Sequence, residues 1–411
     1  MNLLLTSLGG KKINENIIIS GSKSESNRLL ILQKLFPKIT IENLSDSDDS
    51  IHMQHALSTK DKTVDIGHAG TAMRFLTSYF AVQEGRETIL TGSERMQNRP
   101  IEILVNALKD LGADISYEDK VGYPPIKIKG TKLVNSKVQI NGNVSSQYIS
   151  SLLLIASKLD NGLEIELIGK ITSVPYIKMT LSLLGQLGIK SSFEGNIIKV
   201  NSKELINNQT VVVESDWSSA SYFYSIIALS EIGSEITLSA YKEESLQGDS
   251  CLASIYMHFG VETIYGENFI KLKKIKETKK DTLDIDLKNA PDIAQTIAVT
   301  CFAQKIACNL SGLHTLKIKE TDRLVALHDE LSKLGGIISV TNESLHLKVS
   351  KEINKNISIK TYKDHRMAMA FAPLALLVPI VILNAEVVTK SYQKFWDDMK
   401  QIGINITDYQ R

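Results

Sequence analysis

Cysteine is scarce in this chain of 411 residues, which has only Cys251, Cys301 and Cys308. They lie in apolar, helix-like stretches without the paired spacing of a metal site, so we expect reduced, buried thiols and assign them no chemistry. Net charge is small as well, because 47 Lys and Arg stand against 46 Asp and Glu. This balance disfavours a general nucleic-acid binder, and any basic cluster has to be local.

The chain also has little that resembles an export signal or a membrane span. Residues 1–6 contain three leucines with no basic residue before them, and Gly-Gly-Lys-Lys follows at 9–12. The apolar segment 367–383 is interrupted by Pro373 and Pro379 and ends in a strand-like run, which favours a buried helix followed by a buried strand. We therefore expect a cytoplasmic protein without a membrane partner.

A repeat is the most regular feature that the sequence does contain. Helix-like segments end on an apolar residue plus glycine about 70 to 75 residues apart. These glycines are Gly112, Gly188, Gly260, Gly335 and, as a last echo, Gly403. Hairpins are predicted after three of them, at residues 191–200, 263–272 and 338–349.

Helices mixed with antiparallel strands indicate α/β subdomains, and the length suggests two domains. The sequence has no G-x-G-x-x-G or P-loop string that would favour a doubly wound nucleotide-binding fold.

Basic and hydroxyl side chains recur where helices are expected to begin. Lys23 and Ser24 follow a strand-like run and open a helix that carries Arg28 one turn later. The free N–H groups and the dipole of a helix start favour an anion. A plain serine cap with solvated charges is the alternative for this cluster taken alone.

Two further clusters follow the same design. Gly70 allows a ligand to approach the backbone closely, and Thr71 can cap the helix that follows. Arg99 precedes Pro100, which suits the first turn of a helix at 101–111, and a guanidinium there can bind a carboxylate or phosphate bidentately. Each is also compatible with an ordinary loop or surface turn.

Hydroxyls gather at one more helix start, where Ser145, Ser146 and Gln147 lead into the apolar helix expected at 148–156. A capping box explains this cluster equally well without further context.

The second half of the chain places carboxylates among the cations. Asp292 begins an apolar helix, and Glu320 stands beside Lys319 in a polar string, so these two are the best acid–base candidates. Arg366, in Asp-His-Arg, and Lys390, which we expect in a loop, complete the set. The alternative for the Asp-His-Arg string is a helix-capping Asp with an exposed Arg, and the alternative for Lys390 is an ordinary solvated surface charge.

In order from Lys23 to Lys390, these strings resemble the EPSP synthase family of enolpyruvyl transferases. The most diagnostic are residues 21–28, 69–74, 144–147, 318–324 and 364–369. The resemblance implies an α/β, two-domain enolpyruvyl transferase fold, each domain built of three βαβαββ-like units as an inside-out α/β barrel. The first domain would comprise residues 1–20 plus 214–411 and the second 21–213, with crossings near 20 and 214.

The resemblance also implies a reaction and its residues. The enolpyruvyl group of phosphoenolpyruvate would pass to the 5-hydroxyl of shikimate 3-phosphate by addition and elimination, in a monomer without metal or organic cofactor. Residues implied for shikimate 3-phosphate are Lys23, Ser24, Arg28, Ser145, Ser146, Ser173, Tyr176, Asp292, Lys319 and Thr315. Those implied for phosphoenolpyruvate are Lys23, Gly70, Arg99, Gln147, Arg323, Arg366 and Lys390. Asp292, Glu320 and Lys23 would be catalytic.

Three positions depart from the family's pattern. His68 stands where many members have Asn, Lys317 where Arg is common, and Thr315 where Asn often contacts shikimate 3-phosphate.

Two other functions remain open. UDP-N-acetylglucosamine enolpyruvyl transferases share the fold but typically have Lys-Asn in the first motif and a loop cysteine, whereas here Ser24 follows Lys23 and no cysteine precedes Cys251. A non-catalytic anion-binding protein of the same fold would not need intact Asp292 and Glu320.

Overall fold

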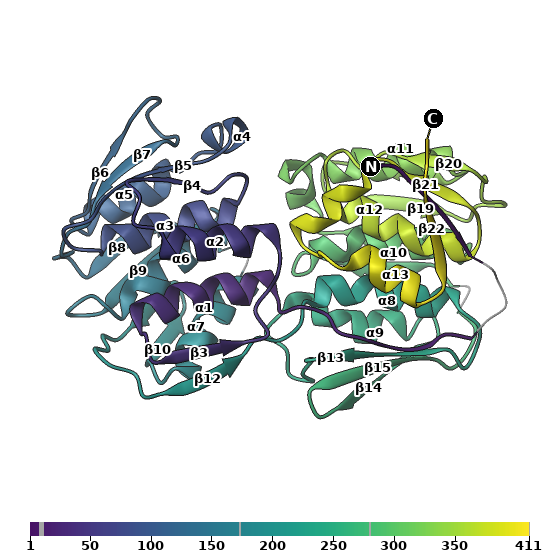
Figure 1. Ribbon diagram of the computed structural model, residues 1–411, viewed down its shortest axis with the longest axis horizontal. Coiled ribbons are helices and arrows are strands. Elements are labelled where there is room, and N and C mark those ends of the chain that lie inside the picture. The colour runs from purple at the N-terminus through teal and green to yellow at the C-terminus, as the bar shows by residue number, and fades with distance from the viewer. Residues whose placement is uncertain (8–11, 172–173, 279–280, 411) are drawn as a thin grey trace. The chain divides into compact units, whose positions relative to one another are not determined.

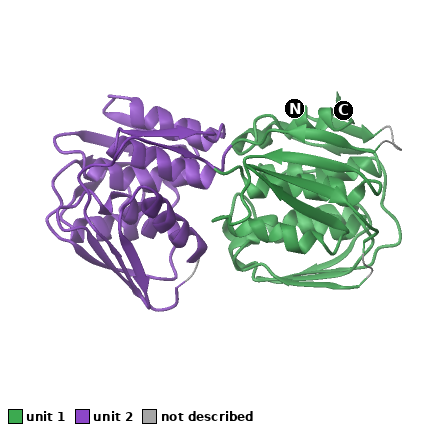
Figure 2. Ribbon diagram, turned by 90° about the horizontal axis from the view of Figure 1, so that it is seen from below, with its two compact units in different colours: residues 1–20, 214–411 green, residues 21–213 purple. Residues whose placement is uncertain are grey.

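The chain divides into two compact units in the computed structural model, which describes residues 1–7, 12–171, 174–278 and 281–410. Unit 1 consists of residues 1–20 and 214–411, and unit 2 of residues 21–213 (Figure 2). The chain therefore passes between the units twice, after Ser20 and after Val213.

One sheet topology recurs in both units: a parallel strand pair continues into an antiparallel hairpin. In unit 2 it is formed, in spatial order, by β4 (Thr63–Asp65), β5 (Glu87–Thr91), β7 (Ile126–Lys129) and β6 (Asp114–Tyr117), and by β8 (Lys137–Asn141), β9 (Leu163–Ile168), β11 (Ile197–Val200) and β10 (Ser191–Glu194). The third sheet of unit 2, within the described residues, is the parallel pair β3 (Ile39–Glu42) and β12 (Gln209–Val212).

Unit 1 has the same strand directions in three sheets of its described residues, although in the last of them an antiparallel pair of distant strands takes the place of the hairpin. They are β2 (Asn14–Ile17), β13 (Glu235–Ser239), β15 (Phe269–Lys274) and β14 (Val261–Gly266); β16 (Leu283–Asp286), β17 (Cys308–Ser311), β19 (Leu345–Lys348) and β18 (Ile337–Val340); and β20 (Ile357–Ile359), β21 (Ile380–Ile382), β1 (Leu3–Ser7) and β22 (Ile404–Asp408). The last sheet takes one strand from the N-terminus, so both ends of the chain are paired there.

Helices connect these strands. Those of unit 2 are α1 (Lys23–Leu35), α2 (Asp48–Ser58), α3 (Gly70–Ala81), α4 (Glu94–Gln97), α5 (Glu102–Asp110), α6 (Ser146–Ala156) and α7 (Val174–Gln186). Those of unit 1 are α8 (Trp217–Leu229), α9 (Leu252–Tyr256), α10 (Ala294–Ala303), α11 (Arg323–Lys333), α12 (His365–Phe371) and α13 (Phe395–Gln401), with 3-10 turns η1 (Gly248–Cys251), η2 (Pro291–Ile293), η3 (His314–Ile318), η4 (Ala372–Leu376) and η5 (Ala385–Lys390).

The core of each unit is made by its helices, around which the sheets lie (Figure 1). Every residue of α10 is buried, including the polar Gln295, Thr296 and Thr300, as expected of a mainly apolar helix that other elements surround. In β13 and β15 buried and half-buried residues alternate, so each strand turns one face to the helices and the other outward. The sequence therefore forms an inside-out arrangement, with helices at the centre.

Local sequence signals are confirmed at several points. The three expected hairpins are β10–β11, β14–β15 and β18–β19. All five helix-ending glycines have positive φ, between 71° and 105°, a region that side chains disfavour and glycine tolerates. The apolar segment at 367–383 forms α12, η4 and β21, which confirms a helix followed by a strand.

The cysteine prediction holds only in part. Cys301 and Cys308 are buried and Cys251 is partly buried, all as free thiols, but Cys308 lies in strand β17 rather than in a helix.

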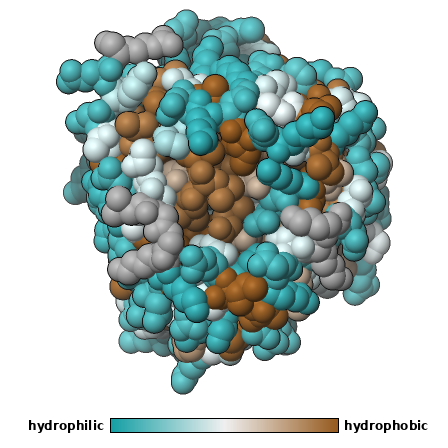
Figure 3. Space-filling view, turned by 90° about the vertical axis from the view of Figure 1, so that its right-hand side faces the viewer, coloured by the Kyte–Doolittle hydropathy of each residue, from teal (hydrophilic) through white to brown (hydrophobic). Residues whose placement is uncertain are grey.

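The surface of unit 1 is mixed in character. The face drawn in Figure 3 has hydrophilic residues around an apolar area near its centre. Within the described residues, we find no helix with both the length and the apolar character needed to cross a bilayer.

Candidate active site

Within unit 2, the first turns of α1, α3, α6 and α7 lie at one end of a helix bundle. The amide of Gln147, in the first turn of α6, donates to the hydroxyl of Thr71, in the first turn of α3, over 3.1 Å. One turn further, Arg28 of α1 donates to Ser150 of α6 and Thr180 of α7. Helix N-termini carry partial positive charge and free N–H groups, so this end of the unit favours anions.

Arg28 is buried among these helices. Its Nε donates to the hydroxyl of Thr180 at 2.8 Å, and its two terminal nitrogens donate to the carbonyl of Ser24 at 2.7 Å and the hydroxyl of Ser150 at 3.1 Å. Burial lowers the pKa of Arg28 to about 10. The guanidinium has more N–H groups than these three bonds use, so it can hold the helix starts together and still donate to a ligand.

Lys23 is the first residue of α1, and its ammonium lies 3.4 Å from the carboxylate of Asp49. Ser22 is the N-cap residue, but its side chain makes no capping hydrogen bond. The plain serine cap that the sequence left open is therefore not what the structure shows at this helix start.

The start of α6 contains a serine cap but not the full capping box that the sequence left open, because the side chain of Gln147 donates to Thr71 instead. The hydroxyl of Ser145 accepts the N–H of Gln147 at 3.4 Å, and Ser146 is the first helical residue. Tyr176 lies in the first turn of α7. Ser173 lies outside the described residues.

Arg99 lies against Gly70 at the start of α3. A Cβ atom added to Gly70 would collide with the guanidinium of Arg99 and would lie 3.3 Å from a terminal nitrogen of Arg74. Arg74 is buried and donates to the carbonyls of Gly70 at 3.1 Å and Pro100 at 3.3 Å. Burial and, second, the charge of Arg99 lower the pKa of Arg74 to about 10.

Arg74 was assigned no role by the sequence, although it stands one turn after Gly70 in the same motif. It joins the start of α3 to the segment that carries Arg99, and so fixes how the two approach each other.

Two local predictions in this region are wrong. Thr71 does not cap α3, because the helix begins at Gly70 and the Thr71 hydroxyl accepts a hydrogen bond from Gln147 instead. Pro100 does not lie in a first turn, because Ile101 is the N-cap residue and α5 begins at Glu102. In the first case a tertiary contact takes the place of a local cap.

Within unit 1, one buried arginine binds three carboxylates. Arg323 donates from Nε to Asp364 at 2.7 Å, from one terminal nitrogen to Asp292 at 2.7 Å and from the other to Glu320 at 2.8 Å. The Arg323 side chain is 2% exposed. Burial alone would lower its pKa, but the three carboxylates raise it above the ordinary value. The guanidinium therefore stays charged.

These groups also stand at helix starts. Asp364 is the N-cap of α12, Arg323 is the first residue of α11, and Asp292 lies in η2 directly before α10. Helices α8 and α10 run parallel, since Ser221 contacts Thr296 and Ser225 contacts Thr300 one turn further. Unit 1 thus repeats the design of unit 2, with carboxylates added.

Asp292 is surrounded by positive charge. Besides Arg323, the ammonium of Lys319 lies at 3.5 Å and a terminal nitrogen of Arg366 at 3.4 Å from its carboxylate. Burial would raise the pKa of Asp292, but Lys319, Arg366 and Arg323 together hold it well below the ordinary value. In this state Asp292 is a carboxylate and a weak base.

Two residues that the sequence did not single out complete this cluster. Arg366 donates to the hydroxyl of Ser218 at 3.2 Å, and that hydroxyl donates to the carboxylate of Asp249. Burial, and next the charge of Asp292, raises the pKa of Asp249 to about 6, while Arg366 acts in the opposite direction. Ser218 could have been noticed because it follows Asp216 at the start of α8; Asp249 had no such signal.

Two predicted residues are placed differently. Lys390 is not in a loop but ends the 3-10 turn η5, and its ammonium donates to the carbonyl of Lys363 at 2.7 Å. The hydroxyl of Thr315, in η3, is buried from solvent and has no hydrogen-bond partner among the described residues.

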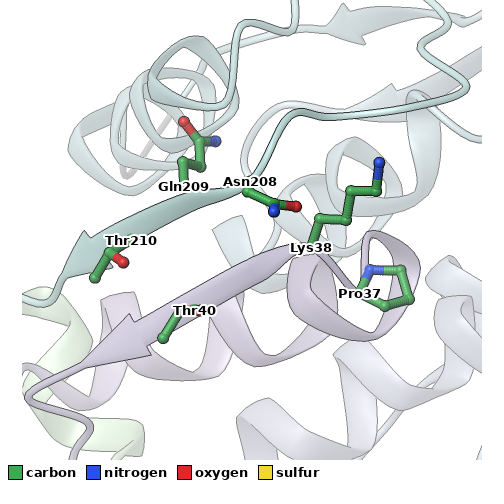
Figure 4. Close-up of a pocket in the computed structure, with 6 residues that line it drawn as sticks. All are labelled: Pro37, Lys38, Thr40, Asn208, Gln209 and Thr210. Atoms are coloured by element: carbon green, nitrogen blue, oxygen red, sulfur yellow. The ribbon is translucent and has the colours of Figure 1, made fainter.

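A polar pocket in unit 2 contains none of these residues. It lies beside β3 and β12 and is lined by Pro37, Lys38, Thr40, Asn208, Gln209 and Thr210 (Figure 4). Within the described part of the chain, no group of three or more His, Cys, Asp or Glu is arranged to hold a metal ion.

Comparison with known proteins identifies relatives along nearly the whole chain. Residues 53–399 match the family model described as EPSP synthase (3-phosphoshikimate 1-carboxyvinyltransferase). The chain is 45% identical over 399 residues to the 3-phosphoshikimate 1-carboxyvinyltransferase of Bacteroides fragilis (strain NCTC 9343), covering 96% of this chain and 97% of the relative. It is 34% identical over 424 residues to the enzyme of that name from Haemophilus influenzae (strain PittEE), covering 95% and 96%.

Solved structures confirm the predicted fold class. An EPSP synthase from Acinetobacter baumannii superposes with a TM-score of 0.82 at 20% identity, covering 99% of this chain and all of that one. The enolpyruvyl transferase NikO from Streptomyces tendae superposes with a TM-score of 0.73 at 14% identity, covering 99% and 98%. At such identities the likeness shows the two-domain enolpyruvyl transferase fold alone.

Proposed function

Because this chain belongs to the EPSP synthase family, we propose that it transfers the enolpyruvyl group of phosphoenolpyruvate to the 5-hydroxyl of shikimate 3-phosphate. The products are 5-enolpyruvylshikimate 3-phosphate and phosphate, in the shikimate pathway that leads to chorismate and aromatic amino acids. The observation that carries the proposal is the cluster in which Arg323 holds Asp292 and Glu320 together beside Lys319 and Arg366. It combines two acid–base candidates with cations for an anionic substrate.

We assign shikimate 3-phosphate to the helix starts of unit 2 and to part of the unit 1 cluster. The phosphate and carboxylate of this substrate suit ammonium, guanidinium and hydroxyl donors at helix N-termini. The residues are Lys23, Ser24, Arg28, Ser145, Ser146, Ser173, Tyr176, Asp292 and Lys319, with Tyr176 packing on the ring. Thr315 is the weakest member of the set, since its hydroxyl is closed to solvent in this structure.

Phosphoenolpyruvate carries a carboxylate and a phosphate within a few atoms and therefore demands several cations. We assign it Lys23, Gly70, Arg99 and Gln147 from unit 2, and Arg323, Arg366 and Lys390 from unit 1. The close approach of the Arg99 guanidinium to Gly70 supports this, because a residue without a Cβ atom allows that cation to lie directly beside the backbone at the start of α3.

Proton transfer is assigned to the two carboxylates. The 5-hydroxyl oxygen attacks C2 of phosphoenolpyruvate while its proton passes to Asp292, and C3 receives a proton from Glu320. Glu320 then removes a proton from C3 as the C2–O bond to phosphate breaks, and the proton held by Asp292 passes to the departing phosphate, so both carboxyl groups return to their starting state. Anionic substrate groups on Arg323 and Arg366 offset the charges that hold the pKa of Asp292 low, so binding makes Asp292 a stronger base.

We further propose that units 1 and 2 act as the enzyme's two domains and that the protein works as a cytoplasmic monomer. Light scattering coupled to size-exclusion chromatography tests the second point: one chain per particle is expected, and a dimer would contradict it.

Phosphate release tests the reaction itself. We expect release with phosphoenolpyruvate plus shikimate 3-phosphate and none when UDP-N-acetylglucosamine replaces the shikimate substrate. Release only with the UDP-sugar would assign the chain to the rival reaction, and no release with either would favour a non-catalytic anion-binding protein. Lys23→Ala and Asp292→Ala are expected to abolish turnover while the circular dichroism spectrum stays unchanged.

A further inference from the structure

Two consecutive residues before α12 have a left-handed backbone. Tyr362 has φ 54° and Lys363 has φ 58°, and neither is glycine. Side chains rarely adopt this region because Cβ crowds the backbone, so the turn persists only if its surroundings hold it.

A buried carboxylate of α11 holds this turn. Glu330, whose side chain is 0% exposed, accepts hydrogen bonds from the hydroxyl of Tyr362 at 2.6 Å and from the N–H of Lys360 at 3.1 Å. Lys333 neutralises it with contacts of 2.7 and 2.8 Å. Burial and, second, the hydrogen bond to Glu330 raise the pKa of Tyr362, so its hydroxyl remains a donor.

The turn is connected to three cations of the proposed phosphoenolpyruvate site. The carbonyl of Lys363 accepts the ammonium of Lys390 at 2.7 Å. The next residue, Asp364, binds Nε of Arg323 at 2.7 Å and accepts the backbone N–H of Arg366 at 2.9 Å. A relaxed turn would displace all three contacts together.

Helix α11 therefore holds the turn at two points on the same face. Arg323 holds Asp364, and Glu330, seven positions later along the helix, holds Tyr362. Residues two helical turns apart face the same side, so the two contacts act from one rigid element.

We propose that Glu330 and Tyr362 form a positioning pair, which keeps the 361–364 turn in its left-handed form and thereby aligns Lys390, Arg323 and Arg366 for phosphoenolpyruvate. Neither residue touches substrate in this proposal. It rests on the proposed function for the identity of the ligand, but the geometry of the turn can be tested without it.

Tyr362→Phe is the primary test, because it removes only the hydroxyl. We expect the KM for phosphoenolpyruvate to rise about tenfold while the KM for shikimate 3-phosphate stays within about twofold, since a small displacement of aligned cations weakens one substrate selectively. Equal changes in both KM values, or no change, would overturn the pair's role.

Tyr224→Phe is the matched control. Its hydroxyl also makes one partly buried hydrogen bond within unit 1, to Thr263 at 2.7 Å, and its ring packs against Trp217 and Tyr256, which are not proposed site residues. We expect Tyr224→Phe to lower the free energy of unfolding by about as much as Tyr362→Phe does, without changing either KM. A rise in the KM for phosphoenolpyruvate in this variant as well would mean that general destabilisation explains the effect.

Lys363→Gly provides a rescue, since the Lys363 side chain is exposed and glycine accepts a positive φ without crowding. When Lys363→Gly is added to Tyr362→Phe, we expect the KM for phosphoenolpyruvate to fall most of the way back to the wild-type value. A double variant no better than Tyr362→Phe would contradict the backbone as the route of the effect.

Crystal structures of the wild type and Tyr362→Phe separate this inference from the proposed function. We expect the variant to lose the left-handed φ values and the bond between Lys390 and the Lys363 carbonyl. If the wild type showed no turnover, the proposed function would fail, but the two crystal structures would still test the positioning role of Glu330 and Tyr362. An unchanged turn in Tyr362→Phe would refute that role.

Discussion

Arg323 and Asp292 form a 2.7 Å ion pair at the starts of α11 and α10 in unit 1, between a guanidinium that is 2% exposed and a carboxylate that is 14% exposed. The same guanidinium binds Glu320 and Asp364. A cation proposed for substrate binding is thus also the group that holds both proposed acid–base carboxylates in place.

Arg323→Lys is expected to lower stability as well as activity. An ammonium cannot reproduce the planar fork that serves three carboxylates, and Asp364 would be left buried without its partner. We expect a loss of about 3 kcal/mol in the free energy of unfolding, measured by urea titration, and little turnover.

Lys132→Met is the control for this change, because Lys132 pairs with Asp160 at 2.7 Å on the exposed surface of unit 2. Exposed pairs contribute little, so its unfolding curve should coincide with that of the wild type. Equal losses in the two variants would show that the Arg323 cluster is not a buried, coupled network.

Gly70→Ala is expected to push the Arg99 guanidinium away from the start of α3. The new methyl would occupy the place of the guanidinium terminus, which is flexible enough to move but would lose its position. We expect the KM for phosphoenolpyruvate to rise about tenfold and the KM for shikimate 3-phosphate to stay unchanged in steady-state kinetics.

Gly185→Ala is the matched control for this prediction. Gly185 is an exposed residue of α7 with open space where a Cβ would lie. The kinetics should not change, and stability should rise by up to about 1 kcal/mol because alanine favours a helix. Unchanged phosphoenolpyruvate affinity in Gly70→Ala would place Gly70 and Arg99 outside that substrate's site.

Asp249→Asn is expected to stabilise the protein in a pH-dependent way. The pKa of Asp249 rises from 3.8 to about 6 on folding, so the folded state binds a proton that the unfolded state releases between these values. Its stabilising contribution is complete below pH 3.8 and is lost as the pH rises through 6. The free energy of unfolding of the variant should therefore rise relative to that of the wild type as the pH increases, by up to about 3 kcal/mol at neutral pH.

Asp292→Asn should change stability with the opposite pH dependence, losing stability relative to the wild type as the pH rises, because the folded state holds the pKa of Asp292 well below 3.8. Its carboxylate stabilises the protein above that pH, and the contribution is lost on acidification. Urea unfolding of both variants from pH 2 to pH 8 measures the two slopes, because the Asp292 contribution is lost below pH 3.8 and the Asp249 contribution between pH 3.8 and 6. Parallel slopes would mean that Asp249 does not titrate near 6.

Much of the fold could be predicted from short stretches. The helix ends at Gly112 and Gly335 and the hairpin at 263–272 are local signals, since a positive φ or a tight turn restricts residue choice at that position. The family could be recognised because several motifs occur in order, although each one alone resembled a helix cap.

The local rules failed where a distant residue competed for the same group. Thr71 was expected to cap α3, yet its hydroxyl accepts from Gln147, 76 residues away. Arg74 had no predicted role but ties Gly70 to Pro100, and Asp249 had no signal at all before its contact with Ser218 was seen. Such partners cannot be read from spacing.

The sequence by itself determined which residues are able to bind anions, because the chemistry of Lys23 and Arg323 and their places at helix starts are local properties. Only the tertiary structure decided what each charge does when no ligand is bound. Arg323 and Asp292 lie 31 positions apart in the chain, and Arg323 and Asp364 lie 41 apart. Burial removes the water that would otherwise solvate these charges, so each must find its partner across the fold, and those partners set the pKa of Asp292.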